Sequence, residues 1–266
     1  MWLLILMIGC ADKDTDTFSL QQSPHVGDSA EVPDMCPDGM IQVAGRHIVS
    51  GEWGADVIAT YAPNIIPEST WELETFCMDA YPWPGIEGEG WMPDGLRWDQ
   101  VVELEALLAQ IDLRLCTLGE LLYASGGADA WRYPYAPENF AEDICDPEDH
   151  TPLNMGTYTE CVSTMGFSDF GIRSAWARLD DQALLLLANG DPSNLPEGDG
   201  SYGIFGGTSR QDTFHAPSNF GIHYYGPGGI AYVTDDVRVC ADPWADPPND
   251  ATERKVSAMR DSFLSQ

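Results

Sequence analysis

The chain has 266 residues, with 43 acidic and 12 basic side chains and a formal net charge of −31. Because such a surface repels phosphate groups, the composition excludes nucleic acid and anionic lipid head groups as partners. A hydrophobic content of 44% with nine tryptophans is enough for a packed core, and the length allows one large domain or two small ones.

The N-terminus predicts export. Residues 1–9 are apolar and end at Cys10, the pattern of a bacterial lipoprotein signal in which Cys10 is lipidated. No basic residue precedes the run, so a simple secretory signal and a mis-assigned start are the alternatives, and the run is too short to span a bilayer. Residues 10–33 are polar and acidic, which predicts a flexible tether. We therefore expect an extracytoplasmic protein, lipid-anchored to a bacterial outer membrane or cell surface.

The cysteine count agrees with an oxidising compartment. The chain has seven cysteines. Those after Cys10 form an even set, which behind an export signal predicts three disulfides. They are Cys36, Cys77, Cys116, Cys145, Cys161 and Cys240. Zinc is a poor alternative, since no Cys-x-x-Cys pair occurs.

The folded body is expected over residues 34–243. A turn at Pro37–Gly39 leads into a strand at Met40–Val43. Apolar and polar side chains alternate over Trp71–Tyr81, which predicts a half-buried strand. After a loop rich in glycine and proline, apolar positions at helical spacing predict a helix over roughly residues 97–110.

The next segment carries its own helix signals. Thr117 can cap a helix, Glu120 can complete a capping box, and Gly126-Gly127 can end it. An ordinary buried helix is the plain interpretation of these residues. Further on, the apolar run Leu184–Leu187 predicts a buried segment, either strand or helix. Residues 244–266 are polar and are expected to form a tail, with a helix over 251–264 and no function that the sequence indicates.

The order of these parts resembles a known family. Arg114-Leu-Cys-Thr-Leu-Gly-Glu120, then Tyr123-Ala, Gly126-Gly and Tyr133-Pro-Tyr resemble the central signature of the sulfatase-modifying factor family, which contains the formylglycine-generating enzymes. Met155–Asp169, the strand at Tyr202–Ser209 and Val237–Ala241 resemble other family segments. The resemblance implies an α+β domain with the family's C-type-lectin-like fold, loop-rich and disulfide-stapled.

Six cysteines allow fifteen pairings. We predict Cys36–Cys77, which would join adjacent strands, Cys116–Cys240, which would tie the signature helix to the last strand, and Cys145–Cys161, which would staple an acidic loop.

The copper site of the family has no counterpart. Formylglycine-generating enzymes bind copper through two cysteines a few residues after a Gly-Gly-Ser strand, because thiolates select Cu(I). The matching positions here are about Gln211 and Ala216, which cannot bind copper. His215 and His223 stand nearby, although two such histidines are more often ordinary surface or core residues. The cleft expected in this region would be lined by Ser209, Arg210, Gln211, His215, His223 and Tyr225.

The resemblance also raises the possibility of calcium. The family's Gly-Asn-Val-Trp-Glu-Trp element, which supplies a calcium ligand, is replaced by Gly171–Arg178, where only Trp176 survives. Carboxylates before it remain as weak calcium candidates, with a solvated acidic loop as the alternative. They are Asp143, Asp146, Glu148 and Asp149.

Three functions are compatible with these residues. The first is a lipid-anchored domain without formylglycine chemistry that binds a protein, peptide or glycan as an accessory module. The second is a divergent metal-dependent oxidoreductase with an unrecognised site, and the third is a structural acidic surface lipoprotein. No phosphate loop, nucleophile elbow or zinc-protease motif occurs in the chain.

Overall fold

The computed structural model describes residues 35–50, 69–89, 96, 98–127, 154–170, 175–181, 183, 202–205, 223–224, 236–244 and 250–264. Asp34–Gln266 forms one compact unit, distinct from Met1–Pro33. Cys10, the tether at residues 10–33, Leu184–Leu187 and the calcium candidates Asp143, Asp146, Glu148 and Asp149 all lie outside the described residues.

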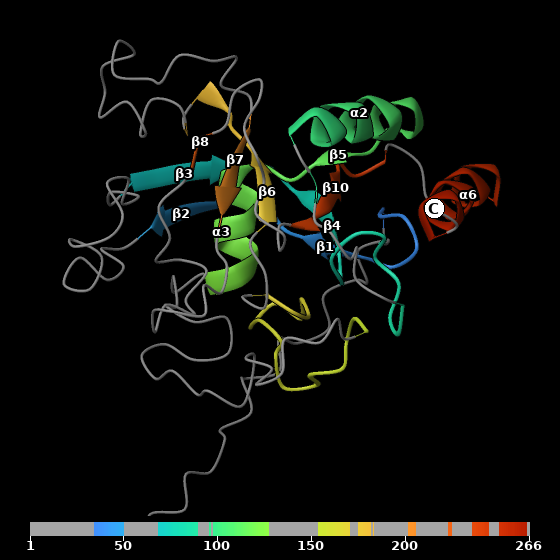
Figure 1. Ribbon diagram of the computed structural model, residues 1–266. Coiled ribbons are helices and arrows are strands. Elements are labelled where there is room, and N and C mark those ends of the chain that lie inside the picture. The colour runs from blue at the N-terminus through green and yellow to red at the C-terminus, as the bar shows by residue number, and fades with distance from the viewer. Residues whose placement is uncertain are drawn as a thin grey trace, which may run out of the picture. The chain divides into compact units, whose positions relative to one another are not determined.

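The described elements combine helices with mainly antiparallel strands (Figure 1). The helices are α2 (Trp98–Leu108), which continues into the 3-10 turn η1 (Ala109–Ile111), α3 (Leu118–Gly126) and α6 (Asp250–Leu264). The strands are β1 (Met40–Val43), β2 (Arg46–Ser50), β3 (Ser69–Leu73), β4 (Phe76–Asp79), β5 (Arg114–Leu115), β6 (Ala175–Arg178), β7 (Tyr202–Phe205), β8 (His223–Tyr224), β9 (Asp236–Val237) and β10 (Val239–Ala241).

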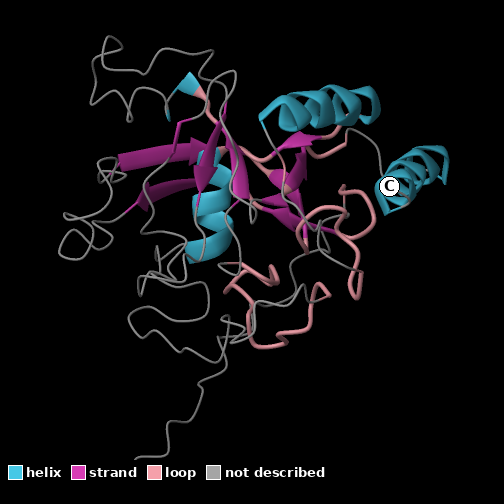
Figure 2. Ribbon diagram, in the orientation of Figure 1, coloured by secondary structure: helices cyan, strands magenta, loops and turns pink. Residues whose placement is uncertain are grey.

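The strands form two four-stranded sheets and a separate β2–β3 pair (Figure 2). The first sheet has the order β1-β4-β10-β5 and is antiparallel throughout. The second has the order β8-β7-β6-β9, in which only the β6–β9 pair is parallel. Arg238 alone separates β9 from β10, so consecutive residues of one chain segment belong to the two sheets.

Both faces of the first sheet are covered (Figure 1). Phe76 and Met78 of β4 pack with α3, whereas Cys77 packs in the second core cluster, to which α2 and α6 contribute. The prediction of one half-buried strand over Trp71–Tyr81 is therefore wrong in two respects. The segment forms two strands, β3 and β4, and β4 is buried along its whole length rather than on one face. Alternate side chains of β4 lie in two different core clusters, so neither face of β4 is exposed to water.

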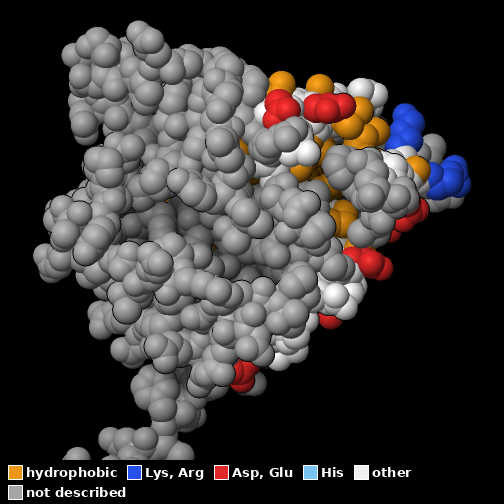
Figure 3. Space-filling view, viewed as in Figure 1, with side chains coloured by type: hydrophobic (Ala, Val, Ile, Leu, Met, Phe, Trp, Pro, Cys, Tyr) orange, Lys and Arg blue, Asp and Glu red, His pale blue; other side chains and the backbone are white. Residues whose placement is uncertain are grey.

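The helix expected in the C-terminal tail is present as α6, and it is part of the folded body. Glu253, Val256 and Arg260 share one face because they are three and four residues apart. Val256 is buried, the Glu253 carboxylate accepts from the backbone N–H of Asp38 at 3.1 Å, and Arg260 donates to the Asp38 carbonyl at 3.0 Å. The opposite side of α6 exposes basic side chains, visible at one end of the face shown in Figure 3.

Arg260 also ion-pairs with Asp79, which is fully buried in β4. The carboxylate oxygen Oδ2 of Asp79 has no hydrogen-bond partner among the described residues. A side chain at Gly85 would come within 2.8 Å of this carboxyl, so a glycine is required where the loop passes over it. Burial raises the pKa of Asp79 to about 7, although the charges of Arg260 and Arg238 act in the opposite direction.

This buried carboxyl gives a prediction about pH. Its ordinary pKa of 3.8 applies to the unfolded chain, so between about pH 4 and pH 7 the native state holds one proton more than the unfolded state. The stabilisation from that proton is complete below the lower value and is lost as the pH rises through the upper one. Relative to Asp79→Asn, the wild-type free energy of unfolding should fall across this window by up to about 1.4 kcal/mol per pH unit.

Denaturant titrations of both proteins from pH 4 to pH 8 measure this difference. The many other carboxylates titrate in both proteins and cancel. Parallel stability curves for wild type and Asp79→Asn would contradict the prediction.

Candidate functional site

The signature segment folds as its residues predict. Thr117 caps α3: its side-chain oxygen accepts from the Glu120 backbone N–H at 3.3 Å, and the Glu120 carboxylate accepts from the Thr117 backbone N–H at 2.7 Å. The capping box is thus confirmed. The helix ends at Gly126, and Gly127 has a φ of 66°. A side chain at Gly127 would meet the Thr164 hydroxyl at 2.4 Å, so the second glycine of the pair is needed for close packing.

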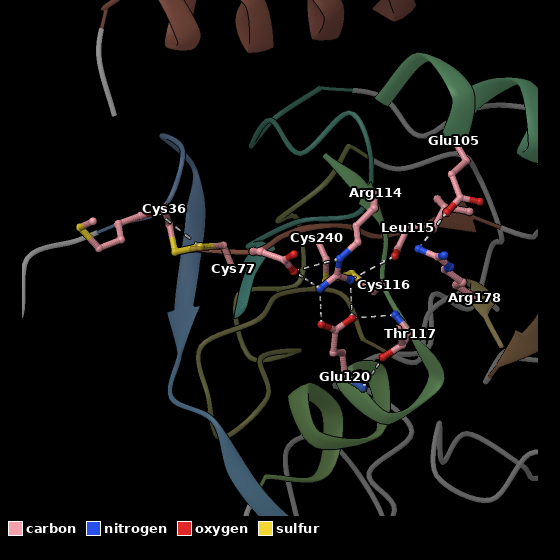
Figure 4. A network of polar contacts seen from close by, with 12 residues as sticks. Cys36, Cys77, Glu105, Arg114, Leu115, Cys116, Thr117, Glu120, Arg178 and Cys240 are labelled. Carbon is pink, nitrogen blue, oxygen red and sulfur yellow. Dashed lines mark hydrogen bonds and ion pairs between the residues drawn. A yellow bond between two sulfur atoms is a disulfide. The ribbon is translucent and has the colours of Figure 1, made fainter. Parts of the chain in front are cut away.

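Glu120 has a second partner, the signature arginine (Figure 4). The two terminal nitrogens of Arg114 donate to the two carboxylate oxygens of Glu120 at 2.8 and 2.7 Å. The same guanidinium donates to Asp242 at 2.9 and 3.2 Å. Glu120 is 6% exposed and Asp242 is 83% exposed, so Arg114 connects a buried carboxylate to a surface one.

The cation in this network is firmly held. Burial acts to lower the pKa of Arg114, but the hydrogen bonds and charges of Glu120 and Asp242 outweigh it and raise that pKa above its ordinary value. Paired bidentate contacts of this kind are among the stronger hydrogen bonds in proteins. The signature residues therefore join β5, α3 and the end of β10.

Two of the three predicted disulfides are confirmed. Cys36 is bonded to Cys77 with a Cα–Cα distance of 5.6 Å, and Cys116 is bonded to Cys240 with a Cα–Cα distance of 4.9 Å. Cys161 is also disulfide-bonded, and its partner lies outside the described residues. Cys145 lies there too, so the pairing Cys145–Cys161 stays a prediction.

The cysteines of the second disulfide stand beside Glu120. The sulfurs of Cys116 and Cys240 and a carboxylate oxygen of Glu120 all lie within 4.8 Å of one another. All of these residues are buried, and within the described ranges no other group of His, Cys, Asp or Glu has this spacing. With the two sulfurs bonded to each other, neither is a thiolate that could bind a metal.

A second polar cluster lies next to the signature, and it was not predicted from the sequence. Glu105 of α2 accepts from the Tyr202 hydroxyl of β7, and it is 3.6 Å from the guanidinium of Arg178 on β6. Arg178 is 50% exposed, and its backbone N–H donates to the Cys116 carbonyl at 2.9 Å. Figure 4 shows the Glu105–Arg178 pair beside the Arg114–Glu120 pair. No local spacing in the sequence links residues on three separate elements.

The cleft predicted from the family alignment falls mostly outside the described residues. This applies to Ser209, Arg210, Gln211, His215 and Tyr225. The backbone of His223 is described: it lies in β8 and pairs with Ile204 of β7. The chain segment that carries the predicted cleft thus starts and ends on neighbouring strands, and the first of these strands holds Tyr202 of the Glu105 cluster.

Comparison with known families gives no matching family model, and comparison with curated proteins gives no match. Among the helices that the structure describes, none combines the length and the apolar character needed to cross a bilayer.

Proposed function

We propose that this chain is a divergent domain of the sulfatase-modifying factor type, with that family's C-type-lectin-like fold, that acts as an extracytoplasmic binding or accessory module. It would be anchored through lipid on Cys10 and would bind a protein, peptide or glycan. Support comes from the Arg114–Glu120 pair, the capping box and the glycine stop, which assemble around one helix in the order that the family signature has.

The observation that carries the proposal is the bonding of Cys240 to Cys116. Formylglycine chemistry requires two thiolates within reach of one copper ion. The segment from Gly206 to Tyr225, where the family has them, contains no cysteine, and Cys240 is the first one after it. Its sulfur is held in a disulfide, which supports a function other than the family's oxidation, because grafted sites often differ on one fold.

The first test is a direct assay. Purified, copper-loaded protein incubated with a peptide that contains a sulfatase motif should leave the cysteine of that peptide unchanged in mass. A true formylglycine-generating enzyme serves as the positive control. Turnover that persists in Cys240→Ser would contradict the proposal and would favour the divergent oxidoreductase.

Binding separates the proposed module from a purely structural lipoprotein. A screen of the full chain against glycans and peptides should give a saturable ligand. Arg178→Ala should weaken that ligand's binding, because Arg178 is half exposed and its strand β6 pairs at Arg178–Tyr202 with β7, one of the two strands between which the predicted cleft segment runs. Arg254→Ala, an exposed arginine on α6, is the matched control. If no ligand binds, the structural interpretation is favoured.

Anchoring has its own prediction. Cys10→Ser should move the protein from the membrane fraction to the soluble extracytoplasmic fraction, because stable anchoring requires the acyl chains that this cysteine would carry. Cell fractionation measures where the protein is found, and mass spectrometry of the N-terminal peptide shows whether Cys10 carries lipid. A wild-type protein that is already soluble, with an unprocessed Met1, would rule out the lipid anchor.

A further inference from the structure

We propose that Cys116, Cys240 and Glu120 form a zinc site when the disulfide between the two cysteines is reduced, so that a metal ion replaces the covalent link between β5 and β10. This inference concerns the scaffold and does not depend on the binding function proposed above. It starts from the three donor groups, which lie within 4.8 Å of one another.

The donor set fits zinc. Two thiolates and one carboxylate are ligands that Zn²⁺ accepts, and zinc sites with three protein ligands complete their tetrahedron with a water molecule. Calcium and magnesium prefer oxygen ligands only, so they do not suit a pair of sulfurs. The Cys36–Cys77 pair is different, because the described residues place no third ligating group at that spacing beside it.

The buried charge selects zinc over Cu(I). A disulfide is neutral, and the Glu120 carboxylate beside it is balanced by Arg114. Two thiolates with one Zn²⁺ are also neutral, so the exchange leaves the charge of the buried cluster unchanged. Two thiolates with Cu(I) would leave one uncompensated negative charge, and burying such a charge is costly. If a Glu120 oxygen binds the metal, Arg114 keeps its ion pair with Asp242.

The exchange balances. A dithiol reductant gives two electrons and two protons to the disulfide, which becomes two thiols, while the reductant becomes a cyclic disulfide. The two thiols then bind Zn²⁺ and release two protons. Zinc bonds of about 2.3 Å to each sulfur require the sulfurs to separate. Cys116 lies just past the end of the two-residue strand β5 and is fully buried, so the separation requires a local shift of this short segment within the core.

The experiment compares two double variants of the full chain, Cys36→Ala/Cys77→Ala and Cys116→Ala/Cys240→Ala, refolded under a dithiol reductant with Zn²⁺. The first keeps the proposed site and the second removes it, while every other cysteine is the same in both. Elemental analysis should find about one more zinc per chain in the first variant. Adding Glu120→Gln to it should weaken zinc binding by at least about 10-fold.

If the double variants do not refold, a second measurement on the wild-type chain and on single variants tests the same site. The reduced wild-type chain is titrated with Co²⁺, whose thiolate complexes absorb in the near ultraviolet. The absorption should be lost in Cys240→Ser and kept in Cys77→Ser. Equal zinc contents in the two double variants, or cobalt absorption that does not depend on Cys240, would overturn the proposal.

Discussion

Replacing Cys116 and Cys240 together with alanine should lower the free energy of unfolding by about 5 kcal/mol under oxidising conditions. The bond joins residues that are 124 positions apart, and the chain-entropy treatment assigns the largest stabilisation to the longest loops. Both cysteines are fully buried in the core cluster that includes α3. The two alanines therefore also remove buried sulfur atoms, which lowers stability further. Urea titration of the purified protein measures the change.

The matched control is Cys36→Ala with Cys77→Ala, which opens a loop of 41 positions between the segment before β1 and β4 of the first sheet. The same chain-entropy treatment gives a loss of about 4 kcal/mol in the free energy of unfolding for this pair. The order of the two effects is the sharper part of the prediction, because errors common to both variants cancel. A larger loss for the shorter loop would show that local packing, not loop closure, sets the contribution of these bonds.

Arg114→Met should lower the free energy of unfolding by about 3 kcal/mol, the lower end of the range for breaking a buried ion pair. The substitution leaves the Glu120 carboxylate, which is 6% exposed, with the Thr117 N–H as its one remaining partner among the described residues. Glu120→Gln should also lower the free energy of unfolding, because it removes the buried negative charge opposite Arg114 and leaves that guanidinium with Asp242 and the Leu115 carbonyl as its charged and polar partners. Thermal and urea unfolding at neutral pH measure both.

Arg254→Ala is the control for these substitutions. It removes an exposed arginine of α6 and should change stability by less than about 0.5 kcal/mol. The double variant Arg114→Met/Glu120→Gln should cost less than the sum of the two single changes, since the two groups form one interaction. If the loss in the double variant equals the sum of the two single losses, the direct Arg114–Glu120 interaction contributes little to stability.

Local sequence determined the elements whose signals lie within a few residues of each other. The strand at Met40–Val43 follows from the turn at Pro37–Gly39, the helix at Trp98–Leu108 from helical spacing, and the helix at Leu118–Gly126 from the Thr117–Glu120 capping box. These features depend on backbone propensity and neighbouring side chains, which the sequence contains in full. The Cys116–Cys240 pairing was also predicted, but from the expected position of the last strand and not from local spacing.

Only the tertiary structure decided how polar residues are used. Asp79 is a charged residue in a strand predicted to be half-buried, yet it is fully buried and pairs with Arg260 of α6, 181 residues away. Glu105, Arg178 and Tyr202 meet because α2, β6 and β7 converge. Whether a charged side chain faces water or an opposite charge depends on which distant segment covers it, and no pattern within one segment records that choice.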